Sequence, residues 1–196
     1  DAPRLQTLTD YWDEIKTLKA VPTVKVDGAS TTLSMDERGQ VHVYSRNWEL
    51  DSMSSNMQLA RRFQLDKMLW PGMAVQFELC GPGVQSNRLK LPAQRPFVFA
   101  VWKDHHKIDR DQWPTGMPNL AVPELDENEW ALTGSVDDMI AKVDGLRGNV
   151  AKDRLDEGIV WHLHEDQRLS EGLADELGAN RCFKIISNKY LTKNGL

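Results

Sequence analysis

The sequence predicts an α+β fold built on antiparallel β-sheets. Short β-branched and apolar runs of strand length recur along the chain, and only a few segments show the helical spacing of about three to four residues. A hairpin turn at 36–39 joins two of these runs directly. With 196 residues and 40% hydrophobic content, the chain can bury a real core, and we expect one domain over residues 1–196.

The first predicted elements are a helix and three strands. Thr9 can cap a helix that continues through Leu18. Gly28 allows a turn between the first two strands. The strands are expected at residues 21–26, 31–35 and 40–45.

Two further helices and four further strands complete the prediction. Met57, Ala60 and Phe63 recur at helical spacing, and Ser135 can cap a second amphipathic helix. The abundance of Pro, Asp and Trp in residues 103–129 predicts an irregular segment without regular secondary structure. The strands are expected at residues 74–80, 97–102, 158–164 and 182–187.

Composition limits the classes of function. A net charge of −5 argues against a protein that simply coats nucleic acid, so a polyanion site must be a local basic groove. Cys80 and Cys182 lie in apolar, strand-like stretches, which predicts buried reduced thiols and an intracellular, reducing compartment. No apolar run reaches membrane-spanning length and no signal peptide is evident. The first residue is not methionine, from which we expect an excised or processed chain.

The tetrad Lys25-Val26-Asp27-Gly28 is the most informative local pattern. A lysine amine is a nucleophile only when neutral, whereas an ordinary lysine is charged near neutral pH. A nearby carboxylate stabilises the ammonium, so a bound divalent cation or another lysine is needed to favour the neutral amine. The tetrad therefore indicates a metal-dependent nucleophile. From these four residues alone, an ordinary exposed lysine at a strand end is the alternative.

Three later segments supply the other groups that nucleotidyl transfer needs. Glu78 lies on an apolar strand before the turn Gly81-Pro82-Gly83. Glu157 again places an acid before a glycine and a β-branched run. Lys184 lies inside an apolar strand, where a charge costs free energy unless an anion meets it.

In chain order these motifs resemble those of the covalent nucleotidyltransferases, the superfamily of polynucleotide ligases and capping enzymes. The string 78–87 is most similar to ATP-dependent RNA ligases, and the ending 184–191 resembles the subfamily with a separate N-terminal OB module. The resemblance spans essentially the whole chain. The motifs are Lys25-x-Asp27-Gly28, Ser45-Arg46-Asn47, Glu78 with Gly81-Pro82-Gly83, Phe97-Val98-Phe99, Glu157-Gly158 and Lys184.

The resemblance implies a nucleotidyltransferase (ATP-grasp-like) fold, with two antiparallel sheets flanked by helices around a nucleotide pocket. It also implies that residues 1–196 are a fragment lacking the OB domain. The implied activity is an RNA-repair ligase that binds ATP and acts on RNA ends or a nicked duplex with a 5′-phosphate and a 3′-hydroxyl. A lysine forms lysyl-AMP, the AMP passes to the 5′-phosphate, and the 3′-hydroxyl displaces it. We expect a monomer.

The resemblance assigns roles to the charged residues. Lys25 is the expected nucleophile on the α-phosphorus, and Lys184 the expected contact to the α-phosphate. Asp27, Glu78 and Glu157 are expected to hold Mg²⁺ or Mn²⁺ on that phosphate. Glu78 in the family also lies near the ribose hydroxyls, and its two roles cannot be separated from sequence.

Other positions are expected to contact the nucleotide or the RNA. Phe99 occupies the adenine-stacking position, with core packing as the alternative, and Ala100 replaces the acid that often follows it. Arg46 resembles an arginine that engages phosphate or the RNA end, with an ordinary surface arginine as the alternative. Val24 and Ser30 belong to the expected nucleotide-binding set, and Ser30 replaces the arginine of DNA ligases and capping enzymes.

Two cations near the chain ends are assigned more loosely. Ile186 stands where some RNA ligases have a second lysine, and Lys189 either replaces that lysine or faces solvent. Arg4 is placed where an OB-bearing ligase could use an arginine on the outgoing phosphates. The rival functions are a DNA ligase, a GTP-dependent mRNA capping guanylyltransferase and an inactive nucleotide- or RNA-binding module.

Overall fold

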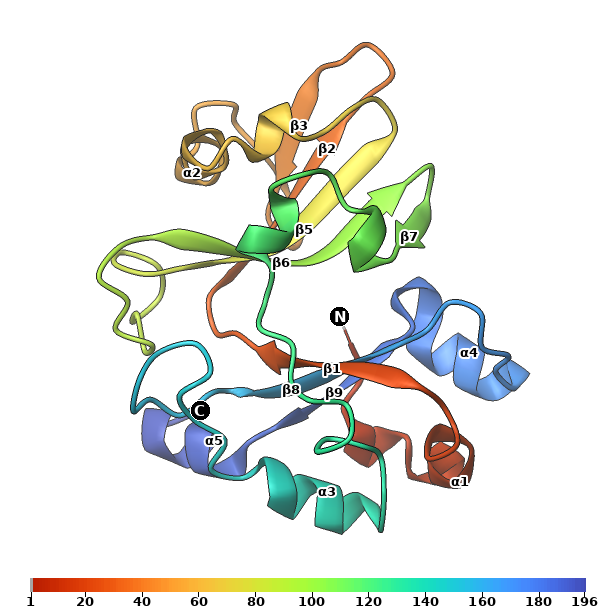
Figure 1. The fold of residues 1–196 in the computed structure, drawn as a ribbon. Coiled ribbons are helices and arrows are strands. Elements are labelled where there is room, and N and C mark those ends of the chain that lie inside the picture. Colours follow the sequence, from red (N-terminus) through yellow and green to blue (C-terminus); the bar gives the residue numbers. More distant parts are fainter. Residues whose placement is uncertain (1) are drawn as a thin grey trace. The chain divides into compact units, whose positions relative to one another are not determined.

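A computed structural model describes residues 2–196, which form two compact units (Figure 1). The first unit comprises the chain up to Val26 together with Pro123–Leu196, and the second comprises Asp27–Val122. Each unit contains one β-sheet, and every strand pair within the two sheets is antiparallel. The predicted α+β class with two antiparallel sheets is therefore confirmed.

The first unit is built on a three-stranded sheet with β8 in the centre. Its strands are β1 (Ala20–Lys25), β8 (Gly158–Leu163) and β9 (Cys182–Ile186). One face packs on a core that includes Trp161 and Phe183, whose rings stack with centroids 5.7 Å apart. The helices of this unit are η1 (Leu5–Thr7), η2 (Thr9–Tyr11), α1 (Trp12–Ile15), α3 (Val136–Val143), α4 (Glu171–Leu177), η6 (Gly178–Asn180) and α5 (Asn188–Asn194).

The second unit is built on a six-stranded sheet in the order β4-β3-β2-β5-β6-β7. The strands are β2 (Ala29–Met35), β3 (Val41–Tyr44), β4 (Glu49–Leu50), β5 (Met73–Cys80), β6 (Arg95–Lys103) and β7 (His106–Ile108). Along β5, buried Val75 and Phe77 alternate with half-buried Gln76 and Glu78, so one face packs on the core. The helices are α2 (Ser55–Arg62), η3 (Leu65–Lys67), η4 (Arg110–Gln112) and η5 (Met117–Leu120).

The predicted cap at Ser135 is confirmed. The Ser135 hydroxyl accepts from the Asp138 backbone N–H at 3.1 Å, and the Asp138 carboxylate accepts from the Ser135 backbone N–H at 2.8 Å. This reciprocal capping box satisfies two donors at the start of α3. The predicted helix around Met57 is likewise present as α2.

The predicted cap at Thr9 is wrong. Thr9 lies inside the 3₁₀ helix η2, and no side chain caps that helix. The α-helical part that follows is short and ends at Ile15. Within residues 103–129, the three-residue strand β7 interrupts the predicted irregular stretch, and α4, α5 and β4 were not predicted. Elements this short carry too few apolar positions to show a clear period.

The chain bends at Gly28 between β1 and β2, as predicted, although these two strands do not form a hairpin. They belong to different sheets, and Gly28 lies where the chain enters the second unit. Cys80 and Cys182 are both buried thiols outside any disulfide, as predicted. Among residues 2–196, no helix has the length and apolar character needed to cross a membrane.

Candidate active site

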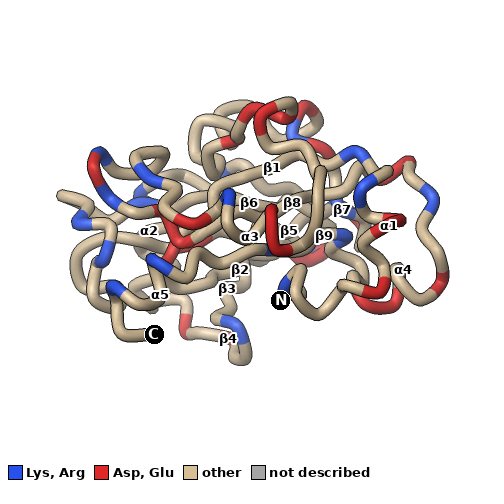
Figure 2. Tube along the Cα trace, turned by 90° about the horizontal axis from the view of Figure 1, so that it is seen from below, with Lys and Arg blue, Asp and Glu red and all other residues tan. Residues whose placement is uncertain are grey.

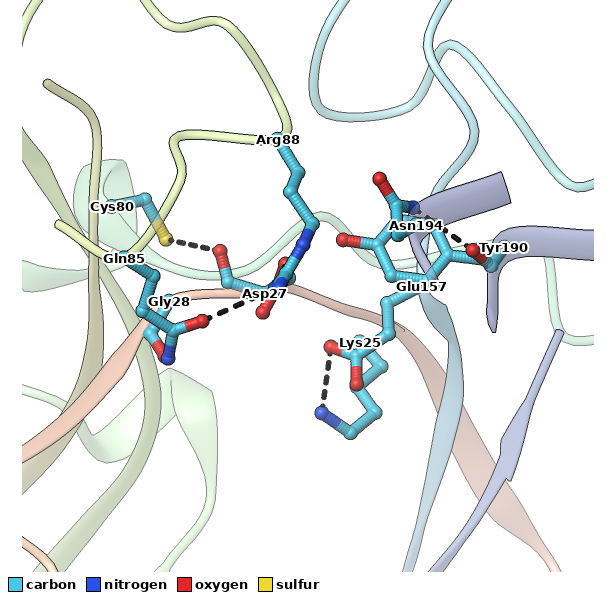
Figure 3. Close-up of polar contacts among 9 residues, drawn as sticks. All are labelled: Lys25, Asp27, Gly28, Cys80, Gln85, Arg88, Glu157, Tyr190 and Asn194. Atoms are coloured by element: carbon cyan, nitrogen blue, oxygen red, sulfur yellow. Dashed lines mark hydrogen bonds and ion pairs between the residues drawn. The ribbon is translucent and has the colours of Figure 1, made fainter. Parts of the chain in front are cut away.

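Lys25 and Glu157 form an ion pair in the first unit (Figure 3). Lys25 ends β1 and pairs in register with Gly158, which begins β8, so Glu157 lies just before the neighbouring strand. The Lys25 Nζ atom lies 2.8 Å from Glu157 Oε2. Only 22% of the Lys25 side chain and 12% of the Glu157 side chain are exposed. A charge-assisted bond with this little solvent access fixes the direction of the amine.

Gly158 sets the position of Glu157. A Cβ atom on Gly158 would lie 2.0 Å from the carbonyl oxygen of Ile185, so only glycine allows β8 to approach β9 this closely. The Ser187 N–H donates to the Glu157 carbonyl oxygen at 2.9 Å. Gly158 is thus required by strand packing, whatever the chemistry of Glu157.

Lys184 lies on the same face of this sheet as Lys25. Lys184 pairs with Val160 on β8, and Val160 pairs with Thr23 on β1. Residues paired across strands share a face, and so do residues two apart on one strand. Thr23, Lys25 and Lys184 therefore lie on the face opposite the core. Lys184 is only 8% exposed, and its backbone N–H donates to the Pro3 carbonyl at 2.9 Å.

The other expected residues of the first unit do not share the sheet position of Lys25 and Lys184. Arg4 is exposed and forms a single β-bridge with Lys184. The Val24 side chain is 1% exposed and lies on the core face, paired with Ile159. Lys189 is exposed at the start of α5. None of these positions by itself tests the role expected from sequence.

Asp27 and Gly28 are held by the loop that follows β5 in the second unit (Figure 3). Arg88 Nη1 lies 2.8 Å from Asp27 Oδ2, and the Gln85 side-chain amide donates to the Gly28 carbonyl. The Cys80 thiol donates to the Asp27 carbonyl at 3.4 Å. Sequence reasoning missed Arg88 and Gln85. Their only signal was a charged and an amide side chain in a loop that begins with a glycine-rich turn.

Gly28 is required by close packing rather than by a turn. A Cβ atom there would lie 2.3 Å from the Leu79 carbonyl oxygen and 2.6 Å from Cys80 Sγ. The φ angle of Gly28 is not positive, so backbone conformation alone would allow other residues. Any side chain would push the tetrad away from β5.

Ser30, Glu78 and Phe97 form a row across the second sheet. Ser30 pairs with Glu78 on β5, and Glu78 pairs with Phe97 on β6. They share the face opposite Phe77, which belongs to the core. Phe97 is 3% exposed, and the Arg95 guanidinium lies 4.4 Å from its ring centroid.

Phe99 is the extra residue of a β-bulge. Val98 pairs with Phe77 and Ala100 pairs with Gln76, so Phe99 has no partner on β5. Its side chain is half-buried and is not part of the buried core. A bulge re-aims the side chain that it carries, which is how this ring escapes the strict alternation of β6.

Arg46 is exposed in the loop between β3 and β4.

The residues expected to bind a metal ion are carboxylates from both units. Within residues 2–196, no group of three or more His, Cys, Asp or Glu side chains could hold a metal ion without help. Asp27 and Glu78 belong to the second unit and Glu157 to the first. Carboxylate oxygens suit Mg²⁺ and Mn²⁺, and Mg²⁺ is usually bound by one or two carboxylates together with substrate phosphates. Each of these carboxylates therefore has the chemistry of a ligand for a cation that arrives with phosphate.

Comparisons with known proteins find a matching family and similar solved structures. The RNA ligase family model matches residues 19–186. No curated protein sequence matches the chain. A mutant of Naegleria gruberi RNA ligase with ATP and Mn is 26% identical, with a TM-score of 0.78, over 100% of this chain and 57% of that one.

Two other structures of the Naegleria gruberi enzyme are similar. The ligase with PPi has a TM-score of 0.78 at 26% identity and covers 100% of this chain and 57% of that chain. A mutant with AMP and Mn has a TM-score of 0.75 at 26% identity, over 98% of this chain and 56% of that chain. The present chain thus spans little more than half the length of these solved structures.

Proposed function

Because the chain belongs to the RNA ligase family, we propose that it is the adenylyltransferase part of an ATP-dependent RNA ligase. The observation that carries this proposal is the paired Lys25 amine at the end of β1, with Lys184 on the same sheet face. Two cations on one face suit a nucleophile and a phosphate contact. The similar structures with ATP, AMP and PPi support the same reaction.

In the first step, Lys25 Nζ loses its proton and forms a bond to the α-phosphorus of ATP, and pyrophosphate leaves. Glu157 orients the amine through the 2.8 Å ion pair. Asp27, Glu78 and Glu157 would hold the cation that accompanies the phosphates. Bound Mg²⁺ or Mn²⁺ would supply positive charge that favours the neutral amine and the charge on the α-phosphate oxygens.

Lys184 then serves as a point charge for the α-phosphate. Its low exposure supports this role, because a lysine so little hydrated interacts strongly with an anion. Arg4, bridged to Lys184 through the backbone, is proposed to contact the outgoing phosphates. Lys189 is exposed, and its replacement of the second family lysine stays a prediction.

The proposed nucleoside contacts come mainly from strands of the second sheet. Phe99, displaced by the bulge, is the proposed adenine-stacking ring. Glu78 and Ser30, paired on the half-buried face, are proposed to meet the sugar and phosphate. Val24 contributes through its main chain, since its side chain is in the core.

The later steps need RNA. AMP passes from Lys25 to an RNA 5′-phosphate, and a 3′-hydroxyl displaces it to form the phosphodiester. Arg46 is proposed to engage the RNA end. An OB domain, a monomeric state and a reducing compartment stay predictions from sequence.

A covalent labelling experiment tests the proposal. The chain is incubated with α-labelled ATP and Mg²⁺ or Mn²⁺, and label is mapped by peptide analysis. We expect label on Lys25 and its loss in Lys25→Met. Lys19→Met, which removes an exposed lysine just before β1, is the matched control and should label normally.

Parallel reactions separate the rival functions. Label from α-labelled GTP instead of ATP would indicate a capping enzyme. Sealing of nicked DNA but not nicked RNA would indicate a DNA ligase. Absence of label on the unmodified chain, or undiminished label on Lys25→Met, would contradict the proposed mechanism.

A further inference from the structure

Trp48 is unusually exposed for a tryptophan. Its exposed fraction is 75%, and that of Met53, five residues later, is 69%. Over residues 2–196 only two other large hydrophobic side chains, Trp70 and Leu196, are exposed. Tryptophan is enriched at interaction surfaces because its ring offers a large apolar area together with a polar N–H. The segment Ser45–Ser54 is therefore a candidate interaction surface.

Local hydrogen bonds fix the backbone that carries Trp48. The Ser45 N–H donates to the Trp48 carbonyl at 2.8 Å, and the Trp48 N–H donates to the Ser45 hydroxyl at 3.2 Å. A second turn carries Met53, whose N–H donates to Asp51 Oδ1 at 2.7 Å. Because these hydrogen bonds already order the loop in the unbound protein, a binding partner does not have to order it.

The sheet register places this loop at the end of the second sheet that bears the nucleotide residues. Thr32 on β2 pairs with Tyr44 on β3, and the two strands are antiparallel. The loop that follows Tyr44 therefore lies at the end where β2 begins, just after Gly28 (Figure 1). Glu78, paired with Ser30, lies at the same end. An RNA strand that reaches these residues would pass the loop.

Charge favours an anionic partner on this unit. The second unit has eleven Lys and Arg against ten Asp and Glu, whereas the first has thirteen against nineteen. The acidity of the chain is therefore confined to the first unit. Figure 2 shows Lys or Arg positions beside β4, and Arg46 is exposed two residues before Trp48. On α2, Arg61 Nη1 donates to the Ser52 carbonyl at 3.3 Å, which brings another guanidinium to this segment.

We infer that Trp48 is a stacking platform for an unpaired base of the RNA strand, with Arg46 on an adjoining phosphate. Every base has a flat π-face, so an exposed indole binds single strands with little sequence preference. A neighbouring arginine supplies the attraction to phosphate that a ring lacks. This inference rests on the proposed RNA ligase function and adds that the enzyme holds an unpaired nucleotide beside its site.

Binding of a single-stranded oligouridylate with a 5′-phosphate tests the inference. We expect Trp48→Ala to weaken binding about 5- to 150-fold, the range for loss of one stacked base. Trp48→Phe should retain most of the affinity, because it keeps a ring. Trp70→Ala, which removes another exposed tryptophan of the same unit, should bind as the unmodified chain does. Quenching of tryptophan fluorescence by the oligonucleotide should largely disappear in Trp48→Phe.

Lysyl-AMP formation is measured in the same preparations. We expect Trp48→Ala to label normally with α-labelled ATP, so weaker RNA binding with normal label supports the inference. If the unmodified chain takes no label, the proposed function fails, while the binding comparison still reports on Trp48. Equal binding by Trp48→Ala, or equal losses in Trp48→Ala and Trp70→Ala, would overturn the inference. So would a dimer of the unmodified chain that Trp48→Ala converts to a monomer, because Trp48 would then contact a second copy.

Discussion

Arg88 Nη1 lies 2.8 Å from Asp27 Oδ2, so the loop that follows β5 holds the acid of the Lys25-Val26-Asp27-Gly28 tetrad. The side chains of both residues are mostly buried, with 20% and 13% exposed. The bond therefore fixes the carboxylate better than an ion pair in open solvent would. Arg88 is a positioning residue in this arrangement, because it acts through Asp27.

We predict that Arg88→Ala slows lysyl-AMP formation by about 10- to 100-fold, the usual range for residues that orient a metal-binding carboxylate. Arg88→Lys should recover part of the rate, since lysine restores the charge but not the planar fork. The dependence on Mn²⁺ concentration should shift in Arg88→Ala. The exposed Lys67 supplies the control, and Lys67→Ala should behave normally. An unchanged metal response in Arg88→Ala would remove the assigned role.

Glu157→Ala should weaken the metal-dependent step of labelling. The variant removes the ion-pair partner of Lys25 Nζ and one carboxylate proposed for the cation. Glu157→Gln keeps a hydrogen-bond acceptor for the amine but not the charge, so it separates orientation from charge. We expect both variants to need more Mn²⁺, with Glu157→Gln closer to the unmodified chain at saturation. A normal Mn²⁺ titration of Glu157→Ala would refute its role.

Gly158→Ala should destabilise the chain by about 2–4 kcal/mol, the scale of severe overpacking. The added carbon would meet the Ile185 backbone at 2.0 Å, which a rotamer change cannot relieve. Gly39→Ala is the matched control, because its Cβ has open space and only the positive φ of 78° opposes it. That change should cost about 1–2 kcal/mol. Thermal or urea unfolding compares the two, and equal losses would disprove a packing role for Gly158.

His42 should make the β3-β4 hairpin sensitive to pH. Its hydrogen bond to Glu49, at 2.8 Å, together with nearby Asp36, raises the pKa of His42 above its ordinary value. A raised folded-state pKa adds stability that is fully present below the unfolded pKa and is lost as pH rises through the folded one. We therefore expect the hairpin to loosen as pH rises above about 6.5.

An NMR titration of the His42 ring checks this expectation, because the observed midpoint should lie above that of a free histidine. Hydrogen exchange of Tyr44 and Leu50 amides should become faster over the same pH range. His42→Gln removes the charge and should abolish this pH dependence. A midpoint at or below the ordinary value would contradict the prediction.

Much of the fold was readable from local patterns. Ser135 was predicted as a cap, and the structure contains the full capping box with Asp138. The predicted strands around Lys25 and Lys184 agree with the observed ones within a residue or two, because short runs rich in Val, Ile and Thr favour strands. The predicted cap at Thr9 is wrong because the type of a capping residue does not indicate whether the following turn is α or 3₁₀.

The sequence by itself determined the order and kind of the chemical groups, including the Lys25 tetrad, the acids at 78 and 157 and the lysine at 184. Tertiary structure alone decided which groups meet. Lys25 touches Glu157 across 132 positions of chain, and Asp27 touches Arg88 across 61. Such pairings depend on strand register and on the close backbone approaches that Gly28 and Gly158 permit. Local propensity cannot encode them, because they arise only when separate strands pack together.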